Sequence, residues 1–258
     1  MPAGIFTALL LQLLLLLLLL LLLLAILLLL FPCRACDMGT AVVAAAVLAG
    51  NGLIYGVPKA SANMLVIDPA NMHATTLPIE NPGSTPYRWL GGVLADNGVV
   101  VGIPFSADSV LLFDPATGTA NTTLLSGDAI GSSATKWVGG VLAGNGLIFG
   151  IPFKETSALV VNPFDDTLDK LALPEVPGQL KFIGGVVAPN GHVLAIPLDT
   201  SQPVLSIDPL TMAVDNKTLA MQTPSSEFMF RGAAVADNGF VYIMPSYATF
   251  VPIVDVGC

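Results

Sequence analysis

The sequence WLGGVLADNGVVVGIPFSADSVLLFDPATG occupies residues 89–118 and carries the signals that decide the fold. One short apolar run leads into Asn97-Gly98, and a second leads from there to Pro104. Asn-Gly between two apolar runs is the strongest short-range signal of a β-hairpin. We expect a type I′ turn at this dipeptide, which requires positive φ at both of its central residues.

The rest of this stretch predicts two further strands. Residues 110–113 form a third apolar run, and the turn that follows begins with Asp114-Pro115 and ends at Gly118. Proline pre-sets φ in such a turn and glycine takes its left-handed position. Residues 119–125 then form a weaker and more polar fourth strand.

The same pattern recurs five times with a spacing of 45–48 residues. Each Asn-Gly is followed seven residues after its asparagine by a proline and preceded six residues earlier by a pair of small residues. The asparagines are Asn51, Asn97, Asn145, Asn190 and Asn238. The prolines are Pro58, Pro104, Pro152, Pro197 and Pro245. The small pairs begin at Ala45, Gly91, Gly139, Gly184 and Gly232. In the first four copies an Asp-Pro or Asn-Pro follows, at Asp68, Asp114, Asn162 and Asp208.

Four antiparallel strands in each copy, the first rich in glycine and the last polar, are typical of one blade of a β-propeller. We therefore predict an all-β fold, a β-propeller of about five four-stranded blades, preceded by one N-terminal apolar helix. The small pairs would let the innermost strand approach the axis closely, and each proline should end the second strand or sit at a bulge. The predicted blades are 37–83, 84–131, 132–177, 178–224 and 225–258, the last incomplete.

The third-strand stretches Met64–Ala70 and Val110–Gly118 resemble the repeats of bacterial YVTN-type and quinoprotein-like propellers. The unit at residues 136–152, KWVGGVLAGNGLIFGIP, is similar to repeats of uncharacterised secreted or surface proteins of unicellular eukaryotes. The resemblance covers about residues 40–258 and implies the propeller architecture, but nothing finer.

Closure of the propeller has three solutions. The five blades could close as a ring without strand exchange, or the chain could be part of a longer propeller. Alternatively, an open set of blades could close by pairing with a second copy. We favour the compact five-blade ring.

The N-terminus carries a separate signal. Residues Ala8–Phe31 are apolar except for Gln12, which is long enough for a helix to span a membrane. The stretch before it has no charged side chain, and Cys33-Arg34-Ala35 places small residues where cleavage after Ala35 would need them. Residues 1–36 are thus predicted to be a signal peptide or a signal-anchor transmembrane helix. Either one assigns the protein to the secretory pathway, extracellular or anchored by a single membrane pass.

The net charge of the chain bears on whether it could bind nucleic acid. The chain has 18 acidic and 9 basic residues, a net charge of −9 and no basic stripe. These properties exclude a nucleic-acid-binding role.

The three cysteines are Cys33, Cys36 and Cys258. In a closed ring the two ends of the propeller are neighbours, so we hypothesise a disulfide of Cys258 with Cys36 or Cys33. Unpaired or palmitoylated cysteines beside the membrane are the alternative. Asn121 and Asn216 begin N-glycosylation sequons on the predicted fourth strands.

A basic residue and an aromatic residue recur together at the start of the first strand, as Arg88-Trp89, Lys136-Trp137 and Lys181-Phe182. One interpretation is a set of cations and aromatic rings around a channel mouth that binds an anionic or sugar ligand. The other is aromatic packing between blades with the base solvated beside it.

Signals for catalysis are weak. The five inner strands contain no acid and no histidine, and His73 and His192 occupy different phases of the repeat, so a surface role is expected for each. Asp165-Asp166 falls in a turn. We predict no catalytic residues, no metal site and no cofactor, and we expect a binding or interaction module rather than an enzyme.

The expected ligand is a protein or a carbohydrate, with membrane contact through the N-terminal segment if it is not cleaved. A propeller-type hydrolase or lyase with a loop-built site and a structural surface protein are the alternatives.

Overall fold

The structure, a computed structural model, describes residues 42–128, 130–176, 178–219 and 230–257. The chain divides into two units, Met1–Asp37 and Met38–Cys258, and every described residue belongs to the second. The predicted leader over 1–36 and all three cysteines lie outside the described residues, so the proposed disulfide stays a prediction. In the part that the structure describes, no helix is long and apolar enough to cross a membrane.

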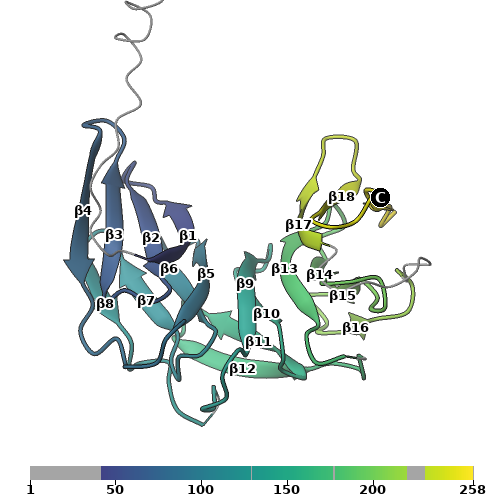
Figure 1. Cartoon of the computed structure of the whole chain (residues 1–258), viewed down its shortest axis with the longest axis horizontal. Coiled ribbons are helices and arrows are strands. Elements are labelled where there is room, and N and C mark those ends of the chain that lie inside the picture. The colour runs from purple at the N-terminus through teal and green to yellow at the C-terminus, as the bar shows by residue number, and fades with distance from the viewer. Residues whose placement is uncertain (1–41, 129, 177, 220–229, 258) are drawn as a thin grey trace, which may run out of the picture. The chain divides into compact units, whose positions relative to one another are not determined.

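The described chain folds into five antiparallel sheets, and in each the strands pair in chain order (Figure 1). The first sheet contains β1 (Val43–Leu48), β2 (Ile54–Pro58), β3 (Asn63–Asp68) and β4 (His73–Pro78). The second contains β5 (Trp89–Leu94), β6 (Val100–Pro104), β7 (Leu111–Asp114) and β8 (Thr119–Asn121). The third contains β9 (Trp137–Leu142), β10 (Ile148–Pro152), β11 (Ser157–Asn162) and β12 (Thr167–Ala172). The fourth contains β13 (Phe182–Val187), β14 (Val193–Pro197), β15 (Leu205–Ile207) and β16 (Val214–Asp215). The fifth has three described strands, β17 (Phe230–Val235), β18 (Val241–Pro245) and β19 (Ile253–Val254).

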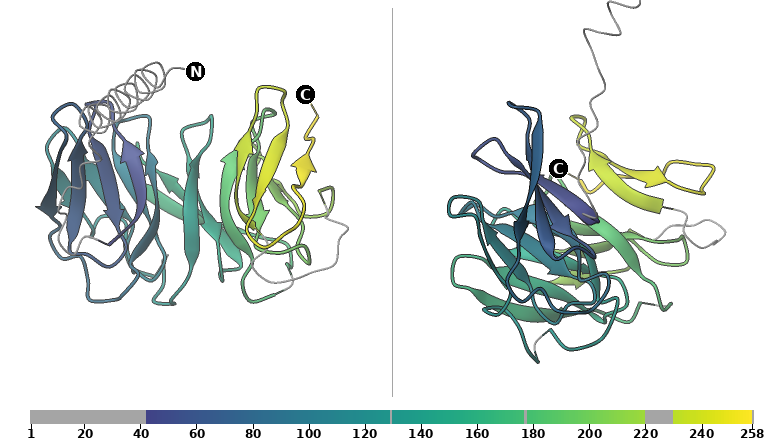
Figure 2. Two further views of the ribbon diagram at one scale, coloured as in Figure 1. Left: turned by 45° about the horizontal axis from the view of Figure 1, so that its top comes forward. Right: turned by 60° about the vertical axis from the view of Figure 1, so that its left-hand side comes forward.

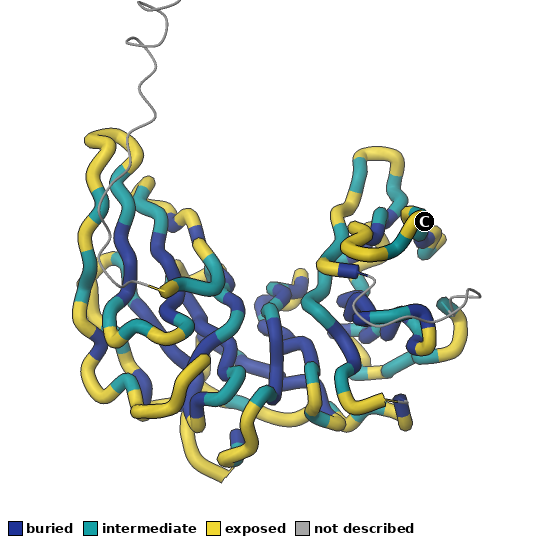
Figure 3. Tube along the Cα trace, viewed as in Figure 1, coloured by how far each residue is buried: buried dark blue, intermediate teal, exposed yellow. Residues whose placement is uncertain are grey.

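In the second, third and fourth sheets, the second strand is the most buried one (Figure 3). The second strands β6, β10 and β14 are buried along their whole length, whereas the fourth strands β4 and β12 alternate between exposed and half-buried residues. A strand buried on both faces lies between two neighbouring sheets, and a strand with one wet face lies at the rim. Each second strand ends at its repeat proline, as predicted.

The first strands of successive sheets contact one another in the order β1, β5, β9, β13, β17 (Figure 2). Glycine makes this approach possible. A Cβ added to Gly91 would lie 2.6 Å from the Cα of Gly139, and one added to Gly139 would lie 3.1 Å from the Cα of Gly184. The expectation that the small pairs permit close approach of the inner strands is confirmed.

The hairpin between the first two strands differs from the expected type I′ turn. In the second sheet, Gly98 N–H donates to Ala95 O, and Ala95 N–H donates to Val99 O. Only the glycine has positive φ, 85° at Gly98, and Asn97 does not. This is the pattern of a three-residue loop in which a residue with left-handed φ follows an ordinary turn. The longer loop lets Asn97 Oδ1 accept the Val99 N–H at 3.2 Å.

The same asparagines also bind the next sheet. Asn97 Nδ2 donates to Pro163 O at 2.7 Å, and Asn145 Nδ2 donates to Pro209 O at 2.7 Å. Asn51 makes the equivalent bond to Pro115 O at 3.4 Å. The Asn-Gly turn of one sheet is therefore held to the Asp-Pro or Asn-Pro turn of the next, which explains why the two motifs keep a fixed spacing.

The close contacts between inner strands run from β1 to β17 and, in the described part of the chain, do not return from β17 to β1. The compact closed ring that we favoured on the sequence is therefore not what the described residues form. The sequence could not reveal this, because a repeat fixes the contact between neighbours but not the number of repeats that closes a ring.

Replacing Gly91 with alanine should lower the free energy of unfolding by about 2–4 kcal/mol, because the methyl group meets the Gly139 backbone at a strained φ of 133°. Gly98→Ala is the matched control. It has positive φ but open space around it, so it should cost only about 1–2 kcal/mol. Urea unfolding of both variants measures the difference, and equal losses would contradict the close approach.

Replacing Asn97 with alanine should lower the free energy of unfolding by about 1 kcal/mol more than replacing Asn238. Both side chains cap their own turn, but only Asn97 bonds to a following sheet, whereas Asn238 Nδ2 donates to Tyr242 Oη within its own sheet. Thermal or chemical unfolding of the pair is the measurement. A loss at Asn238 as large as that at Asn97 would exclude a contribution from the bond between sheets.

Candidate functional site

The three predicted cation–aromatic pairs lie at the start of β5, β9 and β13, and all six side chains are buried. The aromatic members pack in the core. Trp89 Nε1 donates to Ser109 O and Trp137 Nε1 donates to Ser157 O, both at 2.8 Å, and Phe182 is fully buried.

The basic members donate to backbone carbonyls of nearby loops. Lys136 Nζ donates to Ser133 O at 2.6 Å, and Lys181 Nζ donates to Lys154 O at 2.9 Å. Arg88 reaches Ser61 O and Gly83 O. The three bases are thus buried and bonded to backbone carbonyls, although Lys181 also lines a pocket of about 290 Å³ beside Thr156 and Glu175. Anion or sugar binding by the six residues stays a prediction.

Burial lowers the pKa of the Lys136 ammonium group, and the carboxylates of Glu155 and Asp108 only partly oppose this effect. Burial also lowers the pKa of Lys181, again against Glu155. A buried lysine with carbonyl acceptors fits a role in holding loops, because the carbonyl oxygens replace part of the lost hydration.

The Lys136→Met variant should show a weaker rise of stability with pH than the native protein. Because the folded-state pKa of Lys136 lies below its ordinary value of 10.5, the unfolded chain binds more protons in the window between the two values. The free energy of unfolding therefore rises with pH through that window in the native protein. Unfolding curves at several alkaline pH values measure this rise, and Lys217→Met, which removes an exposed lysine, is the control. Parallel pH profiles for the native protein and Lys136→Met would contradict the assignment.

The two sequons differ in their surroundings. Asn121 is the last residue of β8 and is exposed, and its Oδ1 accepts the N–H groups of Thr123 and Leu124 at 2.9 Å. Asn216 follows β16, is half-buried and donates to Glu175 O at 3.1 Å. Glycosylation of either residue stays a prediction.

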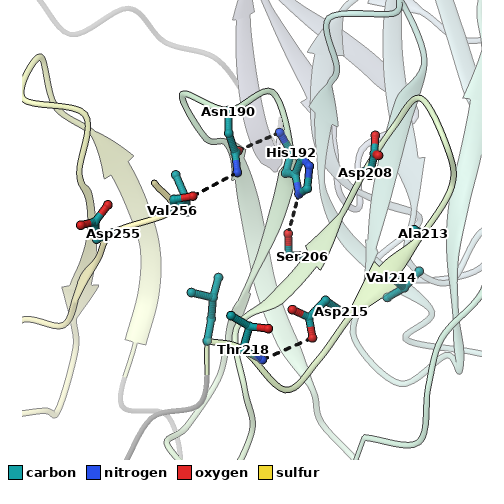
Figure 4. Close-up of a pocket in the computed structure, with 11 residues that line it drawn as sticks. Asn190, His192, Ser206, Asp208, Ala213, Val214, Asp215, Thr218, Asp255 and Val256 are labelled. Carbon is teal, nitrogen blue, oxygen red and sulfur yellow. Dashed lines mark hydrogen bonds between the residues drawn. The ribbon is translucent and has the colours of Figure 1, made fainter. Parts of the chain in front are cut away.

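A pocket of about 350 Å³ lies between the fourth and fifth sheets (Figure 4). The hairpin loop before β14 supplies Asn190 and His192, and β15 supplies Ser206. The chain after β19 supplies Asp255 and Val256. The remaining lining residues are Asp208, Ala213, Val214, Asp215, Thr218 and Leu219.

A hydrogen-bonded chain crosses one wall of this pocket. Asn190 Nδ2 donates to Val256 O at 3.5 Å, and Asn190 Oδ1 accepts the His192 N–H at 3.1 Å. His192 Nδ1 lies 3.0 Å from Ser206 Oγ. The asparagine contact between sheets thus forms part of the pocket, and it holds the histidine backbone in place.

The pocket differs from the rest of the repeat at two positions. Where the fourth repeat has His192, the other repeats have Leu53, Val99, Leu147 and Phe240. Where it has Ser206, the others have Val66, Leu112, Val160 and Ile253. Two apolar positions have thus become a hydrogen-bonded polar pair in one repeat only. His192, for which the sequence predicts a surface role, is half-buried and contacts Ser206. A comparison of equivalent positions in the repeats is the signal that pairs these two residues.

The carboxylates of Asp208, Asp215 and Asp255 line the pocket and make its electrostatic potential negative. A hydrogen bond from the Thr211 side chain, with bonds from the Leu210 and Thr211 backbone, lowers the pKa of Asp208. A hydrogen bond from Thr218 lowers the pKa of Asp215 in the same way. The two groups stay ionised at neutral pH, so the pocket offers oxygen acceptors to a ligand.

The other candidate acids and bases lie elsewhere. His73 is exposed on β4, and Asp165 and Asp166 are exposed in the loop between β11 and β12. Among the described residues, no group of three or more histidine, cysteine or carboxylate side chains is arranged to hold a metal ion.

No family model and no curated protein sequence match the chain. Several solved structures match the fold of the chain. Virginiamycin B lyase from Staphylococcus aureus, solved as a catalytically inactive histidine-to-alanine variant with quinupristin, has a TM-score of 0.65 at 9% identity. The match covers 86% of this chain and 71% of the lyase.

Two further structures extend the comparison. The extracellular domain of a putative one-component system from B. thetaiotaomicron has a TM-score of 0.60 at 10% identity over 86% of this chain and 28% of its own. An auxiliary nutrient-binding protein from Bacteroides ovatus has a TM-score of 0.55 at 14% identity over 86% of this chain and 56% of its own. At these identities the likeness shows the fold alone, and the chain is a β-propeller repeat protein.

Proposed function

We propose that the protein is an exported or membrane-tethered propeller that binds a small polar ligand in the pocket between its fourth and fifth sheets. The observation that carries this proposal is the His192–Ser206 pair, which replaces two apolar residues of the repeat and lies beside ionised carboxylates. The side chains at these two positions are apolar in the other repeats, so the polar pair is particular to the fourth repeat, where it lines the pocket.

The donor and acceptor groups define the chemical class of the ligand. The carboxylates of Asp208, Asp215 and Asp255 accept hydrogen bonds and attract a cation, and the Ser206 hydroxyl group both donates and accepts. A small hydroxylated molecule with an ammonium group, such as an amino sugar, matches these groups. The leader at residues 1–36 and the extracellular domains among the similar structures support a location outside the cell.

Calorimetric titration of the purified chain tests the proposal with three sugars that differ in charge. We expect glucosamine to bind more tightly than glucose, and glucuronate not to bind, because the pocket is anionic. Asp208→Asn should weaken glucosamine binding about tenfold, the loss of one charge-assisted contact.

Asp114→Asn is the matched control, because Asp114 makes the same turn contacts in the second sheet, to Ala116 and Thr117, far along the chain from this pocket. Its binding should equal that of the native protein. Equal loss in both variants, or tightest binding of glucuronate, would contradict the assigned site and its charge.

A second candidate, a lyase or hydrolase, rests on the same histidine. His192 is half-buried, hydrogen-bonded to a hydroxyl group and open to the pocket, an arrangement that suits a general base. Cleavage of an added substrate such as quinupristin, followed by mass spectrometry and abolished in His192→Ala, would establish this function instead of binding alone.

A further inference from the structure

The five asparagines that precede glycine share one turn geometry. In each turn, the asparagine Oδ1 accepts the N–H group of the second residue after it, at 3.1–3.2 Å. The glycine N–H donates to the carbonyl oxygen of the alanine two residues before the asparagine, at 2.8–3.0 Å. All five asparagines are exposed. The five turns therefore form an internal series, in which the contacts of the side-chain nitrogen and the surroundings of the glycine vary.

Four of the five side-chain nitrogens donate a hydrogen bond of ordinary length, and the fifth does not. The bond is 2.7 Å long in Asn97 and Asn145, which donate to a proline carbonyl of the next sheet. It is 2.9 Å long in Asn51 and 2.8 Å in Asn238, which donate to a tyrosine hydroxyl group of their own sheet. Asn190 Nδ2 lies 3.5 Å from a backbone carbonyl of the chain after β19, which is longer than an ordinary N–H···O bond (Figure 4).

The glycine after Asn190 is also open. A Cβ added to Gly191 would have nothing within 4 Å, whereas one added to Gly146 would lie 3.3 Å from the ring of Phe164. Gly191 is exposed and Gly146 is buried. The backbone after Asn190 therefore has room to rearrange and is reached by water, and the backbone after Asn145 is covered.

We propose that Asn190 is a site of spontaneous deamidation, which converts one wall of the pocket between the fourth and fifth sheets from an amide to a carboxylate. The Gly191 nitrogen attacks Cγ of Asn190, and the side-chain nitrogen leaves as ammonia with the glycine proton. Water then opens the succinimide ring and leaves a carboxylate on aspartate or isoaspartate. One water is taken up and one ammonia is released, so the reaction needs no oxidant and no cofactor.

The contacts of the side chain decide which asparagine reacts first. Every one of the five is followed by glycine, which has no Cβ to obstruct ring closure. Before the ring closes, the side-chain nitrogen must leave its acceptor, so a hydrogen bond of ordinary length slows the reaction. Asn190 has the longest contact and an open glycine, and Asn145 has a short bond and a covered one. Asn190 is therefore the fastest site and Asn145 the slowest.

The product of the reaction changes the pocket. A carboxylate has no proton to donate to Val256 O, and it joins the carboxylates that already line the pocket. The same change at Asn238 has a smaller effect, because the Tyr242 hydroxyl group can turn and donate to a carboxylate. Deamidation of Asn190 thus weakens the contact between the fourth and fifth sheets and makes the pocket more negative.

Timed incubation at mildly alkaline pH, followed by tryptic digestion and mass spectrometry, tests the order of rates. The nine lysines and arginines place each Asn-Gly in a different tryptic peptide. We expect Asn190 to deamidate about fivefold faster than Asn97, the factor that corresponds to one hydrogen bond. Absence of conversion at Asn190, or an equal or faster rate at any of the other four asparagines, would overturn the proposal.

The Tyr242→Phe variant tests the cause. It removes the acceptor of Asn238 and keeps the aromatic ring, so deamidation of Asn238 should become about fivefold faster. The rate at Asn97, measured in the same sample, is the control and should not change. An unchanged rate at Asn238 would show that the side-chain bond does not control the reaction.

Urea unfolding of two variants tests the effect on the pocket. Asn190→Asp should unfold at a lower urea concentration than the native protein, because two acceptors then face each other across the pocket wall. Asn238→Asp is the matched control and should unfold with the native protein. Equal midpoints for all three proteins would overturn the effect on the contact between sheets. No ligand enters these measurements, so their outcome is independent of the ligand binding proposed above.

Discussion

The approach of a bare backbone in one sheet to an aliphatic side chain in the sheet before it is the contact on which the rest of the structure depends. Gly92 and Gly140 leave room for Val57 and Ile103, which no residue with a Cβ would do without displacement. Close packing of this kind transmits a change of one methyl group to both neighbours. The glycines of the inner strands are therefore needed for the same reason that the second strands are buried: neighbouring sheets pack in direct contact.

The asparagine hydrogen bonds also depend on the close packing of neighbouring sheets. Asn97 caps its own turn through Oδ1 and reaches Pro163 O of the next sheet through Nδ2, so one side chain fixes a hairpin and the spacing between sheets. Such a bond lies at the partly wet rim, where a hydrogen bond contributes about 1 kcal/mol, whereas apolar burial supplies most of the stability. The asparagine thus specifies the register between sheets more than it stabilises them.

Much of the fold could be predicted from the sequence because its signals are local. Asn-Gly, the second-strand proline and Asp-Pro each act within a few residues, and they placed the first three strands of the second sheet to within about a residue. The fourth strand, predicted over 119–125, is shorter and ends at Asn121. The turn geometry at Asn97 was predicted wrongly, because the loop has three residues and only its glycine has positive φ. The bond to the next sheet is not the cause, since Asn238 lacks that bond and its hairpin has the same turn. The burial of Lys136 was not foreseen either, since a lysine beside a turn is ordinarily solvated and only the folded loop brings Ser133 O to it.

The candidate site could not be predicted from motifs, because it arises where one repeat departs from the others. Neither His192 nor Ser206 belongs to a recognisable motif. They form a candidate site because the fourth sheet places them 3.0 Å apart, beside a pocket wall that the fifth sheet supplies. That wall belongs to the fifth sheet, which buries Val241, Ile243 and Val254 against the fourth sheet. Asp255 and Val256 follow β19 directly, so the packing of these two sheets fixes where the chain lines the pocket.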